Sequence, residues 1–197
     1  MSVLFLALAY LVGSIPVGYL FFRIGENKDI RGFGSRSTGA TNVLRLKGWK
    51  YAVPVAVLDV LKAALPVWLA LQLFDNTRIA LAAAFLVTLG HCFPVFIKFR
   101  GGKGVSTAMG AYAILAPVSF LLSLAVFVGT IAATRFVSLG SLLATLSFPL
   151  WAYFLYNDRQ AAVLGVAMFV LIALRHRGNI QRLLGGQERK FGQRVKI

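Results

Sequence analysis

The sequence predicts an all-α fold, a polytopic integral membrane bundle of helices forming a single domain over residues 1–197. Three observations predict it: hydrophobic residues make up 58% of the chain and charged residues 14%, the mean hydropathy is +0.77, and apolar runs of similar length recur. Soluble domains carry about 25% charged residues. A run of about 20 apolar residues crosses the hydrocarbon core of a bilayer, so each such run is a candidate span.

The first apolar run, residues 2–22, is expected to be a retained span rather than a signal peptide. No basic segment precedes it, and no convincing small-residue cleavage site is visible. A basic loop over 23–50 follows, and then two further spans over 51–73 and 79–97. A second basic loop over 98–104 comes next.

The run 105–134 has the length of one tilted span or of two short ones. Both basic loops and the tail from Arg175 are rich in Lys and Arg, which is typical of cytoplasmic segments. Placing all three on that side requires the run to cross twice. Pro117 gives the natural break, because proline cannot continue the helical hydrogen-bond ladder. We therefore expect about seven crossings, with the N-terminus outside and the C-terminus cytoplasmic. The remaining predicted spans are 136–156 and 161–174.

The net charge of +15 comes from 21 basic and 6 acidic residues. The cations gather at the ends of apolar runs, which favours topology signals and lipid headgroups over nucleic acid as the reason for the excess. The single Cys92 excludes an intramolecular disulfide and gives no zinc pattern. No metal or other cofactor is expected.

Two glycine-rich segments, Gly34–Arg45 and Phe99–Thr107, combine flexible backbone, hydroxyl side chains and positive charge. Glycine lets successive backbone N–H groups face an anion, and Arg and Lys add charge-assisted hydrogen bonds to phosphate. The stretch Gly101–Gly104 lacks the spacing of a nucleotide P-loop, but it opens a predicted helix whose N-terminus suits phosphate. The two segments predict phosphate chemistry at the membrane surface.

The start of the tail has a third polar pattern. His176 and Asn179 are three residues apart and share a face if the last helix continues through them. The alternative is that the arginines of this segment only anchor the chain at the membrane. A pure anchor, however, does not need His, Asn and Gly interleaved with its arginines.

Three ionisable residues, His91, Asp59 and Lys62, lie near or within spans, and each has both a structural and a functional interpretation. His91, close to Pro94, is either catalytic or a brace for the helix break, and we favour the brace. Asp59 and Lys62 lie three apart within a span, where ionisable groups usually pair and often mark function. Both stay outside the predicted catalytic set.

The three polar blocks resemble those of the bacterial acyl-phosphate:glycerol-3-phosphate acyltransferases, integral membrane enzymes of phospholipid synthesis. The first block centres on Gly39–Asn42. The second joins Gly90–Phe96 to Phe99–Val105, and the third runs from Arg175 to Glu188. The likeness extends over nearly the whole chain in the same order. One departure lies in the first block, where Arg36 and Ser37 stand in place of the Gly and Asn usual in the family.

The resemblance implies transfer of a fatty acyl group from acyl phosphate to the 1-hydroxyl of glycerol 3-phosphate, giving lysophosphatidic acid and inorganic phosphate without a metal. It implies a multi-pass protein of the bacterial cytoplasmic (inner) membrane whose site faces the cytoplasm. The two substrates and the lipid bilayer are then its partners, and a soluble acyl-phosphate synthase is a candidate partner at the basic face.

The residues of the three blocks divide into two predicted sets. The predicted catalytic residues, which bind or orient the phosphate of glycerol 3-phosphate, are Ser35, Arg45, Lys103, His176 and Asn179. The predicted substrate-binding residues are Gly34, Ser37, Thr38, Gly39, Ala40, Thr41, Asn42, His91, Gly101, Gly102, Gly104, Arg175 and Glu188.

Three other functions fit the sequence less well. A small anion or phosphate-ester transporter also uses cationic groups in a helical bundle, but no internal repeat is visible, and a vesicle uptake assay separates the two. Acyl-CoA-dependent acyltransferases with a His-x-x-x-x-Asp dyad are disfavoured, because Phe96 and Gln181 occupy the Asp position after the two histidines. A structural basic anchor does not explain the three blocks.

Overall fold

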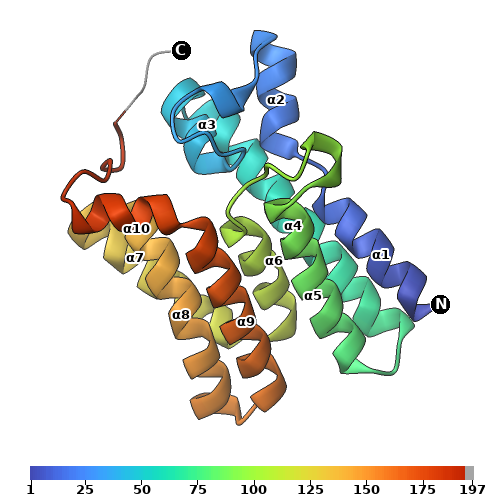
Figure 1. The fold of residues 1–197 in the computed structure, drawn as a ribbon. Coiled ribbons are helices and arrows are strands. Elements are labelled where there is room, and N and C mark those ends of the chain that lie inside the picture. The colour runs from blue at the N-terminus through green and yellow to red at the C-terminus, as the bar shows by residue number, and fades with distance from the viewer. Residues whose placement is uncertain (194–197) are drawn as a thin grey trace.

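The protein is an all-helical bundle in a computed structural model that describes residues 1–193, so the last four residues of the predicted domain lie outside the described part (Figure 1). Within this range the regular structure consists of α-helices and two short 3-10 helices. The α-helices are α1 (Ser2–Gly13), α2 (Val17–Glu26), α3 (Ala40–Lys47), α4 (Trp49–Leu73), α5 (Thr77–Cys92), α6 (Val105–Leu115), α7 (Pro117–Thr134), α8 (Val137–Tyr156), α9 (Arg159–Arg175) and α10 (Arg177–Leu184).

The long helices form the apolar bundle expected from the sequence. α1 packs on α5, α4 packs on α5 and α6, and α8 lies between α7 and α9. The core is built from small and aromatic side chains, including Tyr112 stacked on Phe148 with ring centroids 3.5 Å apart. Many large apolar side chains on the outer faces of the spans are exposed, which suits a hydrocarbon environment.

Five segments have the length and apolarity of a membrane span: Ser2–Glu26, Trp49–Leu73, Thr77–Ile97, Pro117–Thr134 and Val137–Tyr156. A sixth arises if α9 and α10 are counted together. The predicted break at Pro117 is confirmed, because α6 ends at Leu115 and α7 begins at Pro117. At 1.5 Å per residue the short α6 is about 16 Å long, roughly half the thickness of the hydrocarbon core. α6 is therefore an incomplete span among the seven predicted.

Two details differ from the expected elements. The first span is interrupted near Pro16, where the chain leaves α1 and restarts as α2, since proline removes a backbone donor. The last helix does not continue straight through His176, which was the condition for His176 and Asn179 to share a helix face. It bends by 68° there, and α10 lies across the end of the bundle.

The three basic segments gather at one end of the bundle. Figure 1 shows α2, α3 and α10 at that end, together with the loop between α5 and α6. The N-terminus and the turns after α4 and after α8 lie at the opposite end. This arrangement agrees with the expected convergence of the basic segments, whereas the side of the membrane that they face stays a prediction.

Candidate active site

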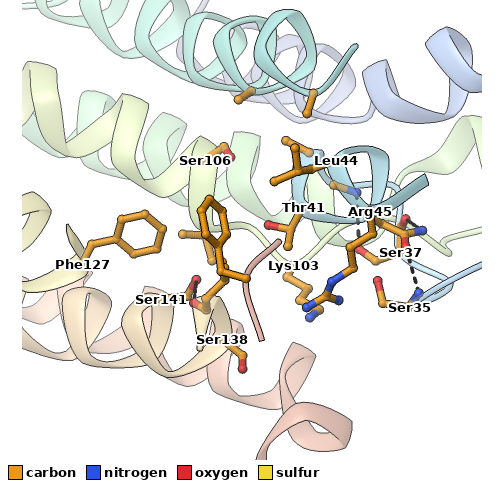
Figure 2. Close-up of a pocket in the computed structure, with 18 of the residues that line it drawn as sticks. Ser35, Ser37, Thr41, Leu44, Arg45, Lys103, Ser106, Phe127, Ser138 and Ser141 are labelled. Atoms are coloured by element: carbon orange, nitrogen blue, oxygen red, sulfur yellow. Dashed lines mark hydrogen bonds between the residues drawn. The ribbon is translucent and has the colours of Figure 1, made fainter. Parts of the chain in front are cut away.

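A cavity of about 420 Å³ opens between the basic end and the middle of the bundle. It is lined by residues of both glycine-rich loops, of α3, α4, α5, α6, α7, α8 and α10, and of the segment after α10 (Figure 2). All five predicted catalytic residues line it. The predicted substrate-binding residues that also line it are Ser37, Gly39, Ala40, Thr41, Asn42, His91, Gly104 and Glu188.

Five predicted substrate-binding residues do not line the cavity: Gly34, Thr38, Gly101, Gly102 and Arg175. They lie behind the lining residues. Thr38 is buried at 3% exposure, and the two glycines of the second loop pack against the end of α5. The structure places these five outside the cavity lining, and their predicted role in substrate binding stays a prediction.

The first loop is held by one side chain, that of Asn42. Its Oδ1 accepts from the Ser35 backbone N–H at 2.8 Å, and its Nδ2 donates to the carbonyls of Ser37 at 2.9 Å and Phe33 at 3.2 Å. Gly34 has φ +61°, and a Cβ there would lie 2.3 Å from Asn42 Oδ1. Asn42 therefore shapes the backbone that presents Ser35 and Ser37 to the cavity.

The second loop is held by backbone hydrogen bonds and by one distant arginine. Gly102 N–H donates to the His91 carbonyl at 3.0 Å, and Gly101 N–H donates to the Cys92 carbonyl at 3.3 Å. Arg175 donates to the carbonyls of Gly102 at 3.1 Å and Gly101 at 3.2 Å. The loop is thereby fixed to the ends of α5 and α9, and it directs Lys103 into the cavity (Figure 2).

A chain of polar side chains crosses the cationic end. Lys103 Nζ donates to Asn179 Oδ1 at 2.6 Å, and Asn179 Nδ2 donates to Glu188 Oε1 at 2.7 Å. Glu188 also accepts from Ser138 Oγ at 3.0 Å and from Arg182 Nε at 2.8 Å, and its Oε1 lies 4.0 Å from Arg45 Nη2. Sequence reasoning missed Ser138 and its neighbour Ser141, whose polarity within an apolar run was the available signal.

Burial and neighbouring charges shift the pKa values of the ionisable side chains at the cationic end of the cavity. Burial, with Arg45 nearby, lowers the pKa of Lys103 to about 8. The pKa of Glu188 is lowered, because the hydrogen bonds from Asn179, Arg182 and Ser138 outweigh its burial. Burial lowers the pKa of His176 to about 4, so this imidazole is neutral near pH 7. Its Nδ1 lies 2.8 Å from the Ile172 carbonyl, which only accepts, so Nδ1 carries the proton and Nε2 is an acceptor.

Two helix N-termini add backbone donors. α3 begins at Ala40 after Gly39, and α6 begins at Val105 after Gly104; these four residues all line the cavity. Within residues 1–193, the N–H groups of Ala40 and Thr41 donate to no protein acceptor. The first N–H groups of a helix and its dipole favour an anion, so both helices reinforce Lys103 and Arg45.

The other end of the cavity is apolar. It runs between α4 and α7 and is floored by Met109 of α6. Figure 2 shows Phe127 on this side, away from Arg45 and Lys103. The apolar side chains that line this end are those of Val53, Ala56, Val60, Met109, Leu124, Phe127 and Ile131. The site thus combines an anion-binding end with a groove suited to an alkyl chain.

Comparison with known proteins decides the family. The family model described as "Glycerol-3-phosphate acyltransferase" matches residues 3–186. The chain belongs to this family. A relative with that name from Thermoanaerobacter sp. (strain X514) is 42% identical over 196 residues, covering 100% of this chain and 98% of the relative. Another, from Syntrophotalea carbinolica, is 42% identical and covers 93% and 94% of the two chains.

Solved structures agree with this family. The crystal structure of PlsY, an integral membrane glycerol 3-phosphate acyltransferase, in its glycerol 3-phosphate form matches with a TM-score of 0.93 at 38% identity, over 97% of this chain and 96% of PlsY. The lysophosphatidic acid form matches with a TM-score of 0.88 at 37% identity, over 98% and 96%. The present chain is therefore an integral membrane acyltransferase of this family.

Proposed function

We propose that this chain transfers a fatty acyl group from acyl phosphate to the 1-hydroxyl of glycerol 3-phosphate, giving 1-acylglycerol 3-phosphate and inorganic phosphate. The observation that carries the proposal is one cavity with two unlike ends. Lys103, Arg45 and two helix N-termini meet at the polar end, and an apolar groove continues from it between α4 and α7. The solved relative, in its glycerol 3-phosphate and lysophosphatidic acid forms, supports the acceptor and the product.

Each substrate has a part of the cavity whose chemistry suits it. Lys103, Arg45 and Asn179 would bind the phosphate of glycerol 3-phosphate, with Ser35 contacting the same molecule. The N–H groups at the start of α3, with Thr41 and the start of α6, would bind the acyl phosphate headgroup. The acyl chain would lie in the apolar groove, where burial of each methylene contributes about 0.8 kcal/mol.

The reaction requires little covalent chemistry from the protein. Acyl phosphate is a mixed anhydride, so phosphate is a good leaving group. The hydroxyl oxygen forms a bond to the acyl carbon, the bond from that carbon to the phosphate oxygen breaks, and the hydroxyl proton passes to the departing phosphate. The protein positions the hydroxyl and stabilises developing negative charge with cations and backbone donors fixed in advance. His176 Nε2, an acceptor, is suited to orient a glycerol hydroxyl.

We further propose that the basic end faces the cytoplasm of a bacterium, with the N-terminus outside the inner membrane. An excess of Lys and Arg marks cytoplasmic segments, and both glycine-rich loops and α10 lie at this end. A site on that side would receive glycerol 3-phosphate from the cytoplasm and its lipid-soluble donor from the bilayer or from a soluble acyl-phosphate synthase.

Phosphate release by the purified protein in detergent tests the proposal. Palmitoyl phosphate is supplied with and without glycerol 3-phosphate, and palmitoyl-CoA serves as the control donor. The proposal expects release that depends on glycerol 3-phosphate, together with formation of lysophosphatidate, and no product from the CoA donor. If folded protein forms no product from either donor, the proposal is overturned. Uptake of phosphate esters into vesicles would then test whether the protein is a transporter.

A further inference from the structure

A cluster of ionisable side chains lies behind the cavity, inside the bundle. Asp59 and Lys62 of α4 meet His91 of α5, and all three are at most 9% exposed. Lys62 Nζ lies 2.8 Å from Asp59 Oδ1, so the two opposite charges pair. Of the three, only His91 lines the cavity. The cluster therefore joins a buried ion pair to a residue of the active site.

Lys62 Nζ has two hydrogen-bonding neighbours besides its ion pair with Asp59, whose two buried carboxylate oxygens accept no hydrogen bond within residues 1–193. It donates to the Ile15 carbonyl at 2.8 Å, where the chain passes from α1 to α2, and it lies 3.0 Å from His91 Nδ1. An ammonium group donates and cannot accept. Since it faces Nδ1 at hydrogen-bonding distance, Nδ1 must offer its lone pair.

This contact decides the form of the imidazole. Asp59 Oδ1 lies 3.5 Å from His91 Nδ1, too far for a strong hydrogen bond, while the shorter contact is to Lys62. With Nδ1 as acceptor, a neutral His91 carries its proton on Nε2. His176 is the opposite case, because its Nδ1 donates to the Ile172 carbonyl. The Lys62 contact therefore favours a tautomer of His91 opposite to that of His176.

The Nε2 side of His91 faces the second glycine-rich loop. A Cβ on Gly102 would lie 2.0 Å from Nε2, so the ring rests where that side chain is missing. Nε2 makes no hydrogen bond within residues 1–193. His91 and Lys103 both line the cavity, and Lys103 directly follows Gly102 in the chain. An Nε2–H without a protein acceptor among the described residues is a donor available to a ligand.

We propose that Lys62, held by Asp59, fixes His91 as the Nε2–H tautomer, and that this N–H donates to a substrate phosphate beside Lys103. His91 then contacts the substrate, whereas Asp59 and Lys62 are positioning residues. The identity of the ligand rests on the proposed function, but the tautomer does not. Both substrates carry a phosphate, so the test must also separate glycerol 3-phosphate from acyl phosphate.

The tautomers can be measured directly, because the chain has two histidines. Protein labelled with ¹⁵N-histidine and freed of any tag is studied in detergent by long-range ¹H–¹⁵N correlation, and the His176→Gln variant assigns the His91 signal. We expect His91 protonated at Nε2 without substrate. Protonation at Nδ1 would overturn the proposal, whether or not the enzyme transfers acyl groups.

Substrate titration identifies the ligand. Glycerol 3-phosphate and palmitoyl phosphate are added separately, and the His91 Nε2 resonance is followed. A shift with one of them supports the contact and names its phosphate, and shifts with both mean that the two phosphates bind within reach. The absence of a shift at concentrations that saturate turnover would overturn the contact.

Two substitutions of His91 distinguish a side chain that donates a hydrogen bond to the substrate from one that only supports the end of α5. His91→Gln places an amide N–H near Nε2 and loses the Lys62 contact, whereas His91→Asn keeps an acceptor near Nδ1 and loses the donor. Loss of a hydrogen bond to a charged group lowers kcat/KM about 10- to 100-fold. We expect this loss in His91→Asn and a smaller one in His91→Gln. Equal activity, or a more active His91→Asn, would contradict the donor role.

Lys62→Met tests the positioning role. The Asp59 carboxylate then faces Nδ1, and since a carboxylate only accepts, we expect the proton to appear on Nδ1. Activity should fall through the KM of the substrate identified in the titration, at unchanged KM for the other. If Lys62→Met folds and His91 keeps Nε2–H alone, the role of Lys62 is wrong. If it does not fold, the wild-type tautomer and the His91 pair still decide.

Discussion

The two glycine-rich loops meet in one cavity, yet different parts of the chain hold them. The first is shaped by the side chain of Asn42, which lies at most nine residues from each of its partners. The second is held by the backbone of His91 and Cys92 and by Arg175, more than seventy residues away. The two loops are therefore similar in composition, but contacts close in sequence shape the first loop and tertiary contacts hold the second.

The difference also concerns what each loop offers to a ligand. The first presents the hydroxyls of Ser35 and Ser37 and the N-terminus of α3. The second presents one charge, Lys103, and the N-terminus of α6. Damage to the first loop should impair its shape, whereas damage to the second should remove or misplace a charge. The variants below test this contrast.

The largest effect is expected for Lys103→Ala. Leaving a bound phosphate without a charged partner costs about 2–5 kcal/mol, or about 30-fold or more in kcat/KM. The rate of lysophosphatidate formation measures it. Lys50→Ala is the matched control, because Lys50 is exposed and outside the cavity. Equal activity of the two variants would remove Lys103 from the site.

Gly102→Ala should be the next most damaging change. Its Cβ would lie 2.0 Å from His91 Nε2, so the ring or the loop must move and carry Lys103 with it. We expect at least a tenfold loss of kcat/KM and a lower unfolding temperature. Gly129→Ala, where a Cβ meets nothing within 4 Å, should keep full activity and should not lower the unfolding temperature, because alanine favours the helix interior. A fully active Gly102→Ala would show that the second loop tolerates displacement.

Asn42→Ala tests the support of the first loop. The variant loses three hydrogen bonds and leaves partly buried backbone groups unsatisfied, which costs about 1–3 kcal/mol of folding stability. Asn42→Asp should fare no better, because a carboxylate can accept from Ser35 but cannot donate to the two carbonyls. Thermal unfolding and activity measure both variants. Wild-type stability of either would mean that the loop has another support.

The pH dependence of kcat/KM should report Lys103. Its pKa of about 8 means that the free enzyme loses this charge as the pH rises above that value, and binding of the phosphate substrate weakens. A bound phosphate retains the proton, so kcat should decline less. Lys103→Arg, if active, should hold its kcat/KM from pH 8 to pH 10, since guanidinium stays charged. An identical alkaline decline in Lys103→Arg would assign it to another group.

The smallest effect is expected at Arg36. Its φ of +58° lies in the left-handed region, where a residue with a Cβ is strained by about 1–2 kcal/mol. Arg36→Gly should therefore raise stability by up to about 1 kcal/mol, as measured by thermal unfolding. A decrease would mean that the arginine side chain makes a contribution larger than the strain.

Much of the fold and site followed from the sequence because its signals are local. Apolar runs identified the spans, Pro117 marked a break, and the loop charges predicted that the basic segments share an end. The break at Pro16 was not predicted, because the run 2–22 carries no charged residue and was expected to be one span. The direction of the chain after the last span was not predicted either, because nothing local in the sequence marks the 68° bend between α9 and α10.

The predicted site residues could be recognised because they are polar or charged groups. The site residues that were not predicted have little distinctive chemistry. Arg45, Lys103, His176 and Asn179 are polar groups next to apolar spans, and all line the cavity. The groove residues between α4 and α7 resemble any other apolar residues of a span. Gly101 and Gly102 stand behind the cavity because backbone hydrogen bonds, which have no sequence signature, hold them at α5.

The measurement that tests the central claim most directly is the stoichiometry of one reaction. Inorganic phosphate and lysophosphatidate are quantified together from palmitoyl phosphate and glycerol 3-phosphate, for the wild type and for Lys103→Ala and Lys50→Ala. One cavity that binds both phosphates predicts equal amounts of the two products, dependence on both substrates, and loss only in Lys103→Ala. Phosphate release without lysophosphatidate, or full activity in Lys103→Ala, would contradict it.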